Sequence, residues 1–237
     1  MEKFQTIKVM ALDLDGPLLV DTFSPLMFQI CKNYGIEYTR DVERNTFSRK
    51  RAEVIEYFRE KFKEKLSDTE RAQTDEEMFA GYFRMRAEYM QTHKVGMKPE
   101  IPAFLERVSK MGVRLICYGG LEESYMKEHL GAYADLFEPY ICTNEFRPGV
   151  TQIVHEICKV KPNEALFVDD VNFVAENVRA IGGAFIGIPS TEPWSWQKKD
   201  MTHTGVRYIF NSVADITPEV LKQIDHESSV GTHWRKR

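Results

Sequence analysis

Two acidic pairs in this chain each follow a short apolar run. Asp13 and Asp15 come after one run, and Asp169 and Asp170 after another. If the two runs are neighbouring parallel strands, the four carboxylates meet at one edge of a sheet. Such a cluster is costly without a cation, and oxygen ligands of this kind suit Mg²⁺. One carboxylate could then attack a phosphorus atom while another transfers the proton.

These acidic residues also have a simpler explanation, because acids at strand ends often cap the following helix. Two separate pairs at equivalent positions are harder to explain as caps alone. We therefore favour a metal-assisted site and keep helix capping as the alternative.

The composition is that of an ordinary globular protein. The chain has 237 residues, of which 43% are hydrophobic and 29% charged, enough for one large domain or for a core with an inserted subdomain. A net charge of -4 gives no reason to expect a nucleic-acid partner. No run approaches the roughly 20 apolar residues of a membrane span, and no signal peptide is recognisable. The four cysteines form no C-x-x-C pair, so we expect reduced thiols and a cytoplasmic protein.

Apolar runs alternate with helical patterns through most of the chain. Alternation of this kind predicts parallel βαβ units, and thus an α/β fold doubly wound around an open sheet. The predicted strands are 7–12, 113–118, 140–142, 165–168, 184–188 and 206–210, and the predicted helices are 102–111, 150–158 and 171–181.

The segment from about residue 22 to 94 breaks this alternation, because it contains no convincing strand. Met78, Tyr82, Met85 and Tyr89 fall at helical spacing, which we interpret as packing between helices. The segment is therefore predicted to be an all-helical insert. The predicted division is an α/β core of residues 1–20 and 96–225, an α-helical cap of 21–95, and a flexible tail of 226–237.

Taken in order, four segments resemble the motifs of the haloacid dehalogenase superfamily, a large group of mostly Mg²⁺-dependent phosphohydrolases. The resemblance covers about residues 5 to 225, and the ordered set is specific for the fold. The helical insert lies where members with an α-helical cap carry that cap. The four segments are DLDGPL from Asp13, MKPEIPAFLERVSKMGVRLICYGG from Met97, Arg147-Pro148, and LFVDDVNFVAENVRAIGG from Leu166.

The resemblance implies a role for each acidic residue. Asp13 would be the nucleophile that forms an aspartyl-phosphate, and Asp15 would be the general acid and then the base. The side chains of Asp13 and Asp169, with the backbone carbonyl of Asp15, would hold Mg²⁺, and Asp170 would support it. Members that dehalogenate small acids lack the second aspartate of the first motif, so Asp15 favours phosphoryl transfer.

Three positions that contact phosphate in the superfamily differ here. Tyr118, followed by Gly119 and Gly120, stands where Thr or Ser is usual. Its hydroxyl or the glycine amides could bind phosphoryl oxygens. Arg147 replaces a lysine and keeps its charge, with a solvated loop arginine as the alternative. Pro17 replaces a threonine and supplies neither hydroxyl nor N–H. The pattern indicates a standard metal site with modified phosphate handling.

The sequence thus predicts a Mg²⁺-dependent phosphohydrolase that acts on a small phosphorylated metabolite. The alternatives are a protein of the same fold that binds phosphorylated ligands without efficient turnover, and a phosphomutase that uses the same aspartyl-phosphate. A dehalogenase fits least. Trp194 and Trp196 follow the fifth predicted strand and either floor the site or pack on the surface.

Overall fold

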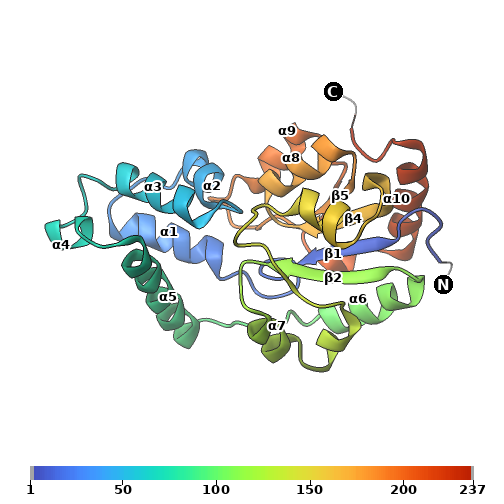
Figure 1. The fold of residues 1–237 in the computed structure, drawn as a ribbon, viewed down its shortest axis with the longest axis horizontal. Helices are drawn as coiled ribbons and strands as arrows, with labels where there is room; N and C mark the ends of the chain where they lie inside the picture. The colour runs from blue at the N-terminus through green and yellow to red at the C-terminus, as the bar shows by residue number, and fades with distance from the viewer. Residues whose placement is uncertain (1–2, 236–237) are drawn as a thin grey trace.

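The computed structural model describes residues 3–235, in which an α/β core carries a helical cap at one end of its sheet (Figure 1). Within these residues, six strands form one parallel sheet in the order β3-β2-β1-β4-β5-β6. All six predicted strands are confirmed, with ends that differ by at most two residues. The strands are β1 (Val9–Asp13), β2 (Arg114–Gly119), β3 (Ile141–Cys142), β4 (Ala165–Asp169), β5 (Ala184–Gly187) and β6 (Tyr208–Ile209).

The direction of strand addition reverses between β1 and β4. The chain adds β2 and β3 on one side of β1 and then returns to add β4 on the other side. In open α/β sheets, ligands bind beyond the carboxyl ends of the strands at such a reversal. The register pairs Leu12 with Val168, so the next residues, Asp13 and Asp169, leave the sheet beside each other.

Helices of the core cover both faces of the sheet. Met10 and Leu12 contribute to the apolar cluster that includes α6 and α10, while Val9 and Ala11 contribute to the cluster that includes α8. This alternation follows from the period of two residues in a strand. No helix in the described part of the chain is long and apolar enough to cross a membrane. The core helices are α6 (Ile101–Val108), α7 (Glu123–Leu130), α8 (Asn172–Ile181), α9 (Gln197–Thr204) and α10 (Pro218–Val230).

The predicted helices of the core are present with local departures. The helix expected over 102–111 is α6, continued by a short 3₁₀ turn that stops at Gly112, whose φ is 71°. The segment expected over 150–158 is helical but has π-type hydrogen bonding over Gln152–Ile157. These departures leave the predicted order of strands and helices unchanged.

The cap is all-helical, as predicted, and lies between β1 and α6. Its apolar cluster includes Met27, Val42 and Phe62, with Tyr82 and Met85 of α5 packed against it but only partly buried. The stripe predicted to pack between helices is therefore only partly covered. The cap helices are α1 (Phe23–Asn33), α2 (Arg40–Thr46), α3 (Arg51–Lys61), α4 (Asp68–Arg71) and α5 (Asp75–Thr92).

The flexible tail predicted for residues 226–237 is not observed in its described part. Helix α10 continues to Val230, and His233 beyond it is buried. The indole Nε1 of Trp234 donates a hydrogen bond to the carbonyl oxygen of Gly183 at 2.9 Å. The prediction is wrong for residues 226–235 because these aromatic and polar contacts hold them against the core. Residues 236 and 237 lie outside the described residues.

Candidate active site

The structure brings the four predicted aspartates to the carboxyl edge of β1 and β4. Asp13 and Asp169 end their strands, and Asp15 and Asp170 lie in the loops that follow. Burial raises the pKa of Asp13, and the charge of Asp169 raises it further. Burial also raises the pKa of Asp170, again with a contribution from Asp169. The carboxyl groups thus interact electrostatically, as a convergent site requires.

The loop after β1 is fixed by a contact that only glycine permits. Gly16 has a φ of +112°, and a Cβ atom there would collide with the carboxylate of Asp170. On the other side, Lys98 Nζ donates a hydrogen bond to the carbonyl oxygen of Gly16. Gly16 therefore allows the loop that carries Asp15 to pack closely against Asp170.

Asp15 is held by Thr22, a residue that the sequence did not single out. The Thr22 hydroxyl donates to Asp15 Oδ2 at 2.9 Å, and the Thr22 N–H donates to Oδ1 at 3.3 Å. Burial and then the charge of Asp21 raise the pKa of Asp15 to about 7, while Arg86 and Thr22 oppose the rise. A carboxyl group that titrates near neutrality can donate and accept a proton in turn.

Arg86 reaches the same region from helix α5 of the cap. Its Nε donates to the hydroxyl of Thr22 at 3.0 Å, and its guanidinium lies 4.8 Å from the ring centroid of Tyr125 in α7. Arg86 is only 7% exposed, and its Nη2 has no hydrogen-bond partner among the described residues. The contacts from Arg86 through Thr22 to Asp15 thus connect the cap to the candidate acid. Arg86 and Glu43 are the two charged residues of the described cap whose side chains are buried.

Tyr118, a predicted phosphate-binding residue, is hydrogen-bonded to a carboxylate of the site. Its hydroxyl donates a hydrogen bond to Asp169 Oδ2, and its ring packs edge-on against Phe167 at 5.9 Å between centroids. The other oxygen of Asp169 accepts the N–H of Val171 at 2.7 Å. Burial raises the pKa of Asp169 to about 6, although the Tyr118 hydrogen bond opposes the rise.

A cavity of about 490 Å³ lies between the core and the cap and reaches the acidic residues. Asp13, Asp15 and Asp170 line it, together with the predicted Gly119 and Gly120. Asp169 and Tyr118 are not part of its wall. The structure therefore separates the predicted site into a layer that faces the cavity and a buried pair behind it.

Arg147 lines the same cavity and is partly buried. Its guanidinium fills the space where a Cβ atom at Gly120 would stand. Asn144 Nδ2 donates to the carbonyl oxygen of Gly120 at 3.1 Å, and Asn144 Oδ1 lies 3.5 Å from Arg147 Nη2. Burial raises the pKa of Asp13, and the charge of Arg147 opposes that rise. A guanidinium close to Asp13 is suited to bind phosphoryl oxygens.

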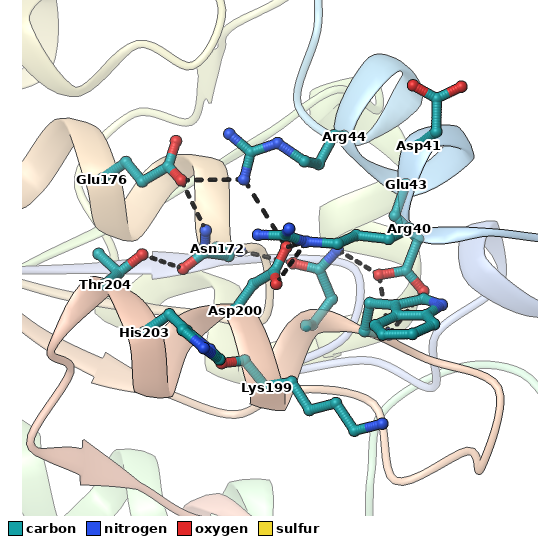
Figure 2. A network of polar contacts seen from close by, with 12 residues as sticks. Arg40, Asp41, Glu43, Arg44, Asn172, Glu176, Lys199, Asp200, His203 and Thr204 are labelled. Carbon is teal, nitrogen blue, oxygen red and sulfur yellow. Dashed lines mark hydrogen bonds and ion pairs between the residues drawn. The ribbon is translucent and has the colours of Figure 1, made fainter.

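Trp194 and Trp196 lie at the joint between core and cap and do not line the cavity. The indole of Trp194 stacks on Phe28 of α1, with 4.7 Å between centroids. The backbone N–H of Trp196 donates to Glu43 of α2 at 3.0 Å. Figure 2 shows the polar side of this joint, where Arg40 of α2 pairs with Asp200 of α9 at 2.7 Å. These contacts fasten the cap to the core.

The acidic residues fit Mg²⁺ by the chemistry of their donors. Carboxylate and carbonyl oxygens are the ligands that Mg²⁺ prefers, and a cation would relieve the repulsion among these buried groups. Asp170 is 6% exposed and lines the cavity, whereas Asp169 is 1% exposed and both its oxygens accept hydrogen bonds. Within residues 3–235, no three His, Cys, Asp or Glu side chains already converge as a metal site.

Comparison with known proteins supports the fold. No family model and no curated protein matches the chain. A phosphonoacetaldehyde hydrolase-like protein from Oleispira antarctica superposes with a TM-score of 0.69 at 16% identity, over 98% of this chain and 97% of that one. β-Phosphoglucomutase from Clostridium difficile superposes with a TM-score of 0.68 at 15% identity, over 94% of this chain and 99% of that one. A haloacid dehalogenase-like protein of unknown function from Agrobacterium tumefaciens superposes with a TM-score of 0.63 at 14% identity, over 92% of this chain and 99% of that one. The chain has the haloacid dehalogenase-like fold with a helical cap inserted after β1.

Proposed function

We propose that this protein is a Mg²⁺-dependent phosphatase that works through an aspartyl-phosphate on Asp13. The observation that carries the proposal is the convergence of Asp13, Asp15, Asp170 and Arg147 on one cavity. That cavity lies where the strand order reverses, which is the usual ligand position in such sheets. The substrate is a small phosphorylated molecule enclosed between core and cap.

In the first step, a carboxylate oxygen of Asp13 attacks the phosphorus atom, and the bond from phosphorus to the leaving oxygen breaks. Asp15 enters as the carboxylic acid and gives its proton to that oxygen. Its pKa of about 7 supports this role, because a substantial fraction is protonated near neutral pH. The guanidinium of Arg147 and the N–H groups of Gly119 and Gly120 are suited to bind the remaining phosphoryl oxygens.

In the second step, Asp15 is a carboxylate and removes a proton from water. The water oxygen attacks phosphorus, the bond to Asp13 breaks, and phosphate is released with Asp13 regenerated. Thr22 supports this role because it binds both oxygens of Asp15 and holds the carboxylate in one orientation.

Mg²⁺, when bound, would neutralise charge on the phosphoryl oxygens and the nucleophile. We assign Asp13, Asp170 and the backbone carbonyl of Asp15 as its ligands. Asp169 would support them from behind, held by Tyr118. This order of Asp169 and Asp170 is the reverse of the one implied by the resemblance, because Asp170 faces the cavity and Asp169 does not.

Aryl-phosphate turnover with and without Mg²⁺ tests the proposal, with Asp13→Asn as the variant and the exposed Asp135→Asn as its matched control. We expect Mg²⁺-dependent turnover in the wild type and the control, and a loss of at least ~10³-fold in Asp13→Asn. Turnover that survives in Asp13→Asn would reject the nucleophile. Absence of Mg²⁺-dependent turnover across a broad panel of phosphate esters would instead favour a binding protein.

A further inference from the structure

The cavity continues from the acidic residues into the cap, between α1, α3 and α5. Asp13, Asp170 and Arg147 line its core end, whereas the cap contributes many apolar side chains together with charged ones such as Arg51, Arg84 and Glu88. The apolar residues of its wall include Met27, Phe58, Met78, Phe79, Tyr82 and Met85. The wall therefore presents more apolar than polar surface, with the acidic residues of the core at one end.

Helix α5 presents apolar side chains that protein packing leaves partly uncovered. Phe79, Tyr82 and Met85 line the cavity and are only half-buried, and Phe83 is 41% exposed. Within α5, all of which is described, Arg86 is the one fully buried side chain. Apolar area left in water costs free energy that an apolar ligand would recover. This helix face thus has the character of a binding wall.

Some of the polar side chains that the cap contributes to the cavity wall have partners within the protein, whereas Arg86 Nη2 has none among the described residues. The Thr46 hydroxyl donates to a backbone carbonyl of its own helix, and Asp21 accepts two backbone N–H groups at the start of α1. Glu70 accepts the hydroxyl of Tyr34 at 2.6 Å, and Arg49 Nε donates to a carbonyl of α2 at 2.8 Å. A sugar in the cap part of the cavity would place many of its hydroxyl groups against apolar side chains, where they would lose their hydration.

We infer that the substrate is a phosphomonoester of a bulky apolar alcohol, with its phosphoryl group at Asp13 and its apolar part between α3 and α5. The inference rests on the proposed function and specifies its substrate class. A volume of about 490 Å³ greatly exceeds what a phosphoryl group needs. It falls in the range of roughly 300–1,000 Å³ that holds molecules of drug size. The apolar part is an aryl ring system or a medium-length alkyl chain.

A graded series of substrates provides the first test. We expect kcat/KM to rise roughly two- to fourfold per methylene from ethyl to octyl phosphate, until the cavity is filled. Glucose 6-phosphate should be a poor substrate. Comparison of phenyl with 2-naphthyl phosphate then distinguishes a ring from a chain as the preferred occupant. No rise with chain length together with no gain from the second ring, or a preference for the sugar phosphate, would overturn the inference.

Gly81 allows the cavity to be blocked without disturbing the helix. It lines the cavity on the same helical face as Met78 and Met85, and a Cβ there has only the end of the Arg84 side chain within 4 Å. Leucine also has a better helix propensity than glycine. Gly81→Leu should lower the ratio of octyl to ethyl phosphate kcat/KM roughly tenfold, the equivalent of about two buried methylenes.

Two controls accompany this variant. Gly81→Ala adds a single methyl group and should leave the ratio within about twofold to fourfold of the wild type. Ile157→Ser alters an apolar residue that is 44% exposed on the core and should not change the ratio. If Gly81→Leu has the same octyl to ethyl phosphate ratio of kcat/KM as the wild type, the apolar part binds elsewhere or cap side chains fill the cavity. Either result would overturn the inference.

Calorimetric binding of octyl phosphate to Asp13→Asn separates this inference from the catalytic proposal. Binding with a negative heat-capacity change, weakened by adding Gly81→Leu, supports the apolar site even if no ester is turned over. In that case the phosphatase proposal alone fails. Efficient turnover of every ester with equal kcat/KM, and no such binding, overturns the substrate class and leaves the phosphatase proposal standing.

Discussion

Among single residues, the main feature of the site is a set of four carboxyl groups, two buried and two partly buried, in which burial raises each pKa. The pKa rises from 3.8 to about 7 for Asp15 and to about 6 for Asp169. Between about pH 4 and 7, these four groups without metal therefore bind more protons in the folded protein than in the unfolded chain. Their contribution to the free energy of unfolding decreases as pH rises through that window.

This linkage predicts how Mg²⁺ affects stability. Without metal, Tm should fall between pH 5 and pH 7, and Mg²⁺ should raise it more at pH 7, where its ligands are more ionised. At roughly 100 times its Kd, Mg²⁺ adds about 2.7 kcal/mol, which corresponds to about 5–10 °C. Thermal unfolding in EDTA and in Mg²⁺ at both pH values measures the effect, with NaCl of equal ionic strength as control. An equal shift at both pH values would contradict a carboxylate metal site.

Tyr118→Phe tests the hydrogen bond to Asp169. Loss of the hydroxyl removes an interaction that lowers the pKa of Asp169 against the effect of burial. The free energy of unfolding at pH 7 should fall by about 1.5–3 kcal/mol, the usual contribution of a hydrogen bond to a charged group. Mg²⁺ affinity should fall about tenfold or more, as happens when a supporting residue is lost. Tyr133→Phe, at a more exposed tyrosine, is the matched control, and unchanged Mg²⁺ affinity in Tyr118→Phe would reject this role.

At the scale of elements, α2 joins the cap to the helix that follows β4. Glu43 of α2 is 1% exposed and accepts hydrogen bonds from the N–H of Trp196 and, at 2.7 Å, from Gln197 Nε2. The side-chain oxygen of Gln197 accepts the N–H of Asn172 at 2.6 Å, at the start of α8. The cap is thus tied to the segment that carries Asp170, while α5 leaves its apolar face open to the cavity.

Glu43→Ala should weaken this joint. It leaves the Trp196 N–H and the Gln197 amide without their buried acceptor, and each unsatisfied donor costs about 1–3 kcal/mol. We expect a loss of about 3 kcal/mol in unfolding free energy, seen as a Tm lower by about 6–12 °C. Glu56→Ala, at an exposed residue of α3, should stay within about 0.5 kcal/mol. A Tm for Glu43→Ala equal to that of this control would show that the joint contributes little.

At the scale of the whole molecule, the C-terminal segment closes against the edge of the sheet farthest from β3. Trp234 contacts Gly183 before β5 and forms an isolated bridge with Val206 before β6. The Arg235 N–H donates to the carbonyl oxygen of Gly205 at 2.9 Å. The end of the chain thereby fixes the two strands that extend the sheet beyond β4.

Trp234→Ala should therefore destabilise the protein without altering its chemistry. We expect a loss of about 1–3 kcal/mol in denaturant unfolding, because the indole is half-buried and loses one hydrogen bond. Turnover of aryl phosphate at 25 °C should match the wild type, since Trp234 lies outside the cavity wall. Thr232→Ala, at an exposed residue of the same segment, serves as control. An unfolding midpoint unchanged by Trp234→Ala would mean that this segment does not stabilise the core.

The sequence by itself determined the architecture and the place of the acidic residues. Strands buried on both faces of a parallel sheet need continuous apolar runs, so runs such as 165–168 could be recognised without a structure. Residues that follow such strands gather at the same edge, so Asp13 and Asp169 were predicted to meet. The helical insert was also predictable, because it interrupts the alternation of strands and helices.

Only the tertiary structure decided which of these side chains face the cavity. Asp169 and Asp170 are adjacent, and the contacts of Tyr118 and Gly16 from other segments direct one inward and the other to the cavity. Arg86 resembles any charged cap residue until its burial beside Thr22 is seen. Side-chain direction and burial depend on neighbours far away in the chain, which local patterns of residue type do not encode.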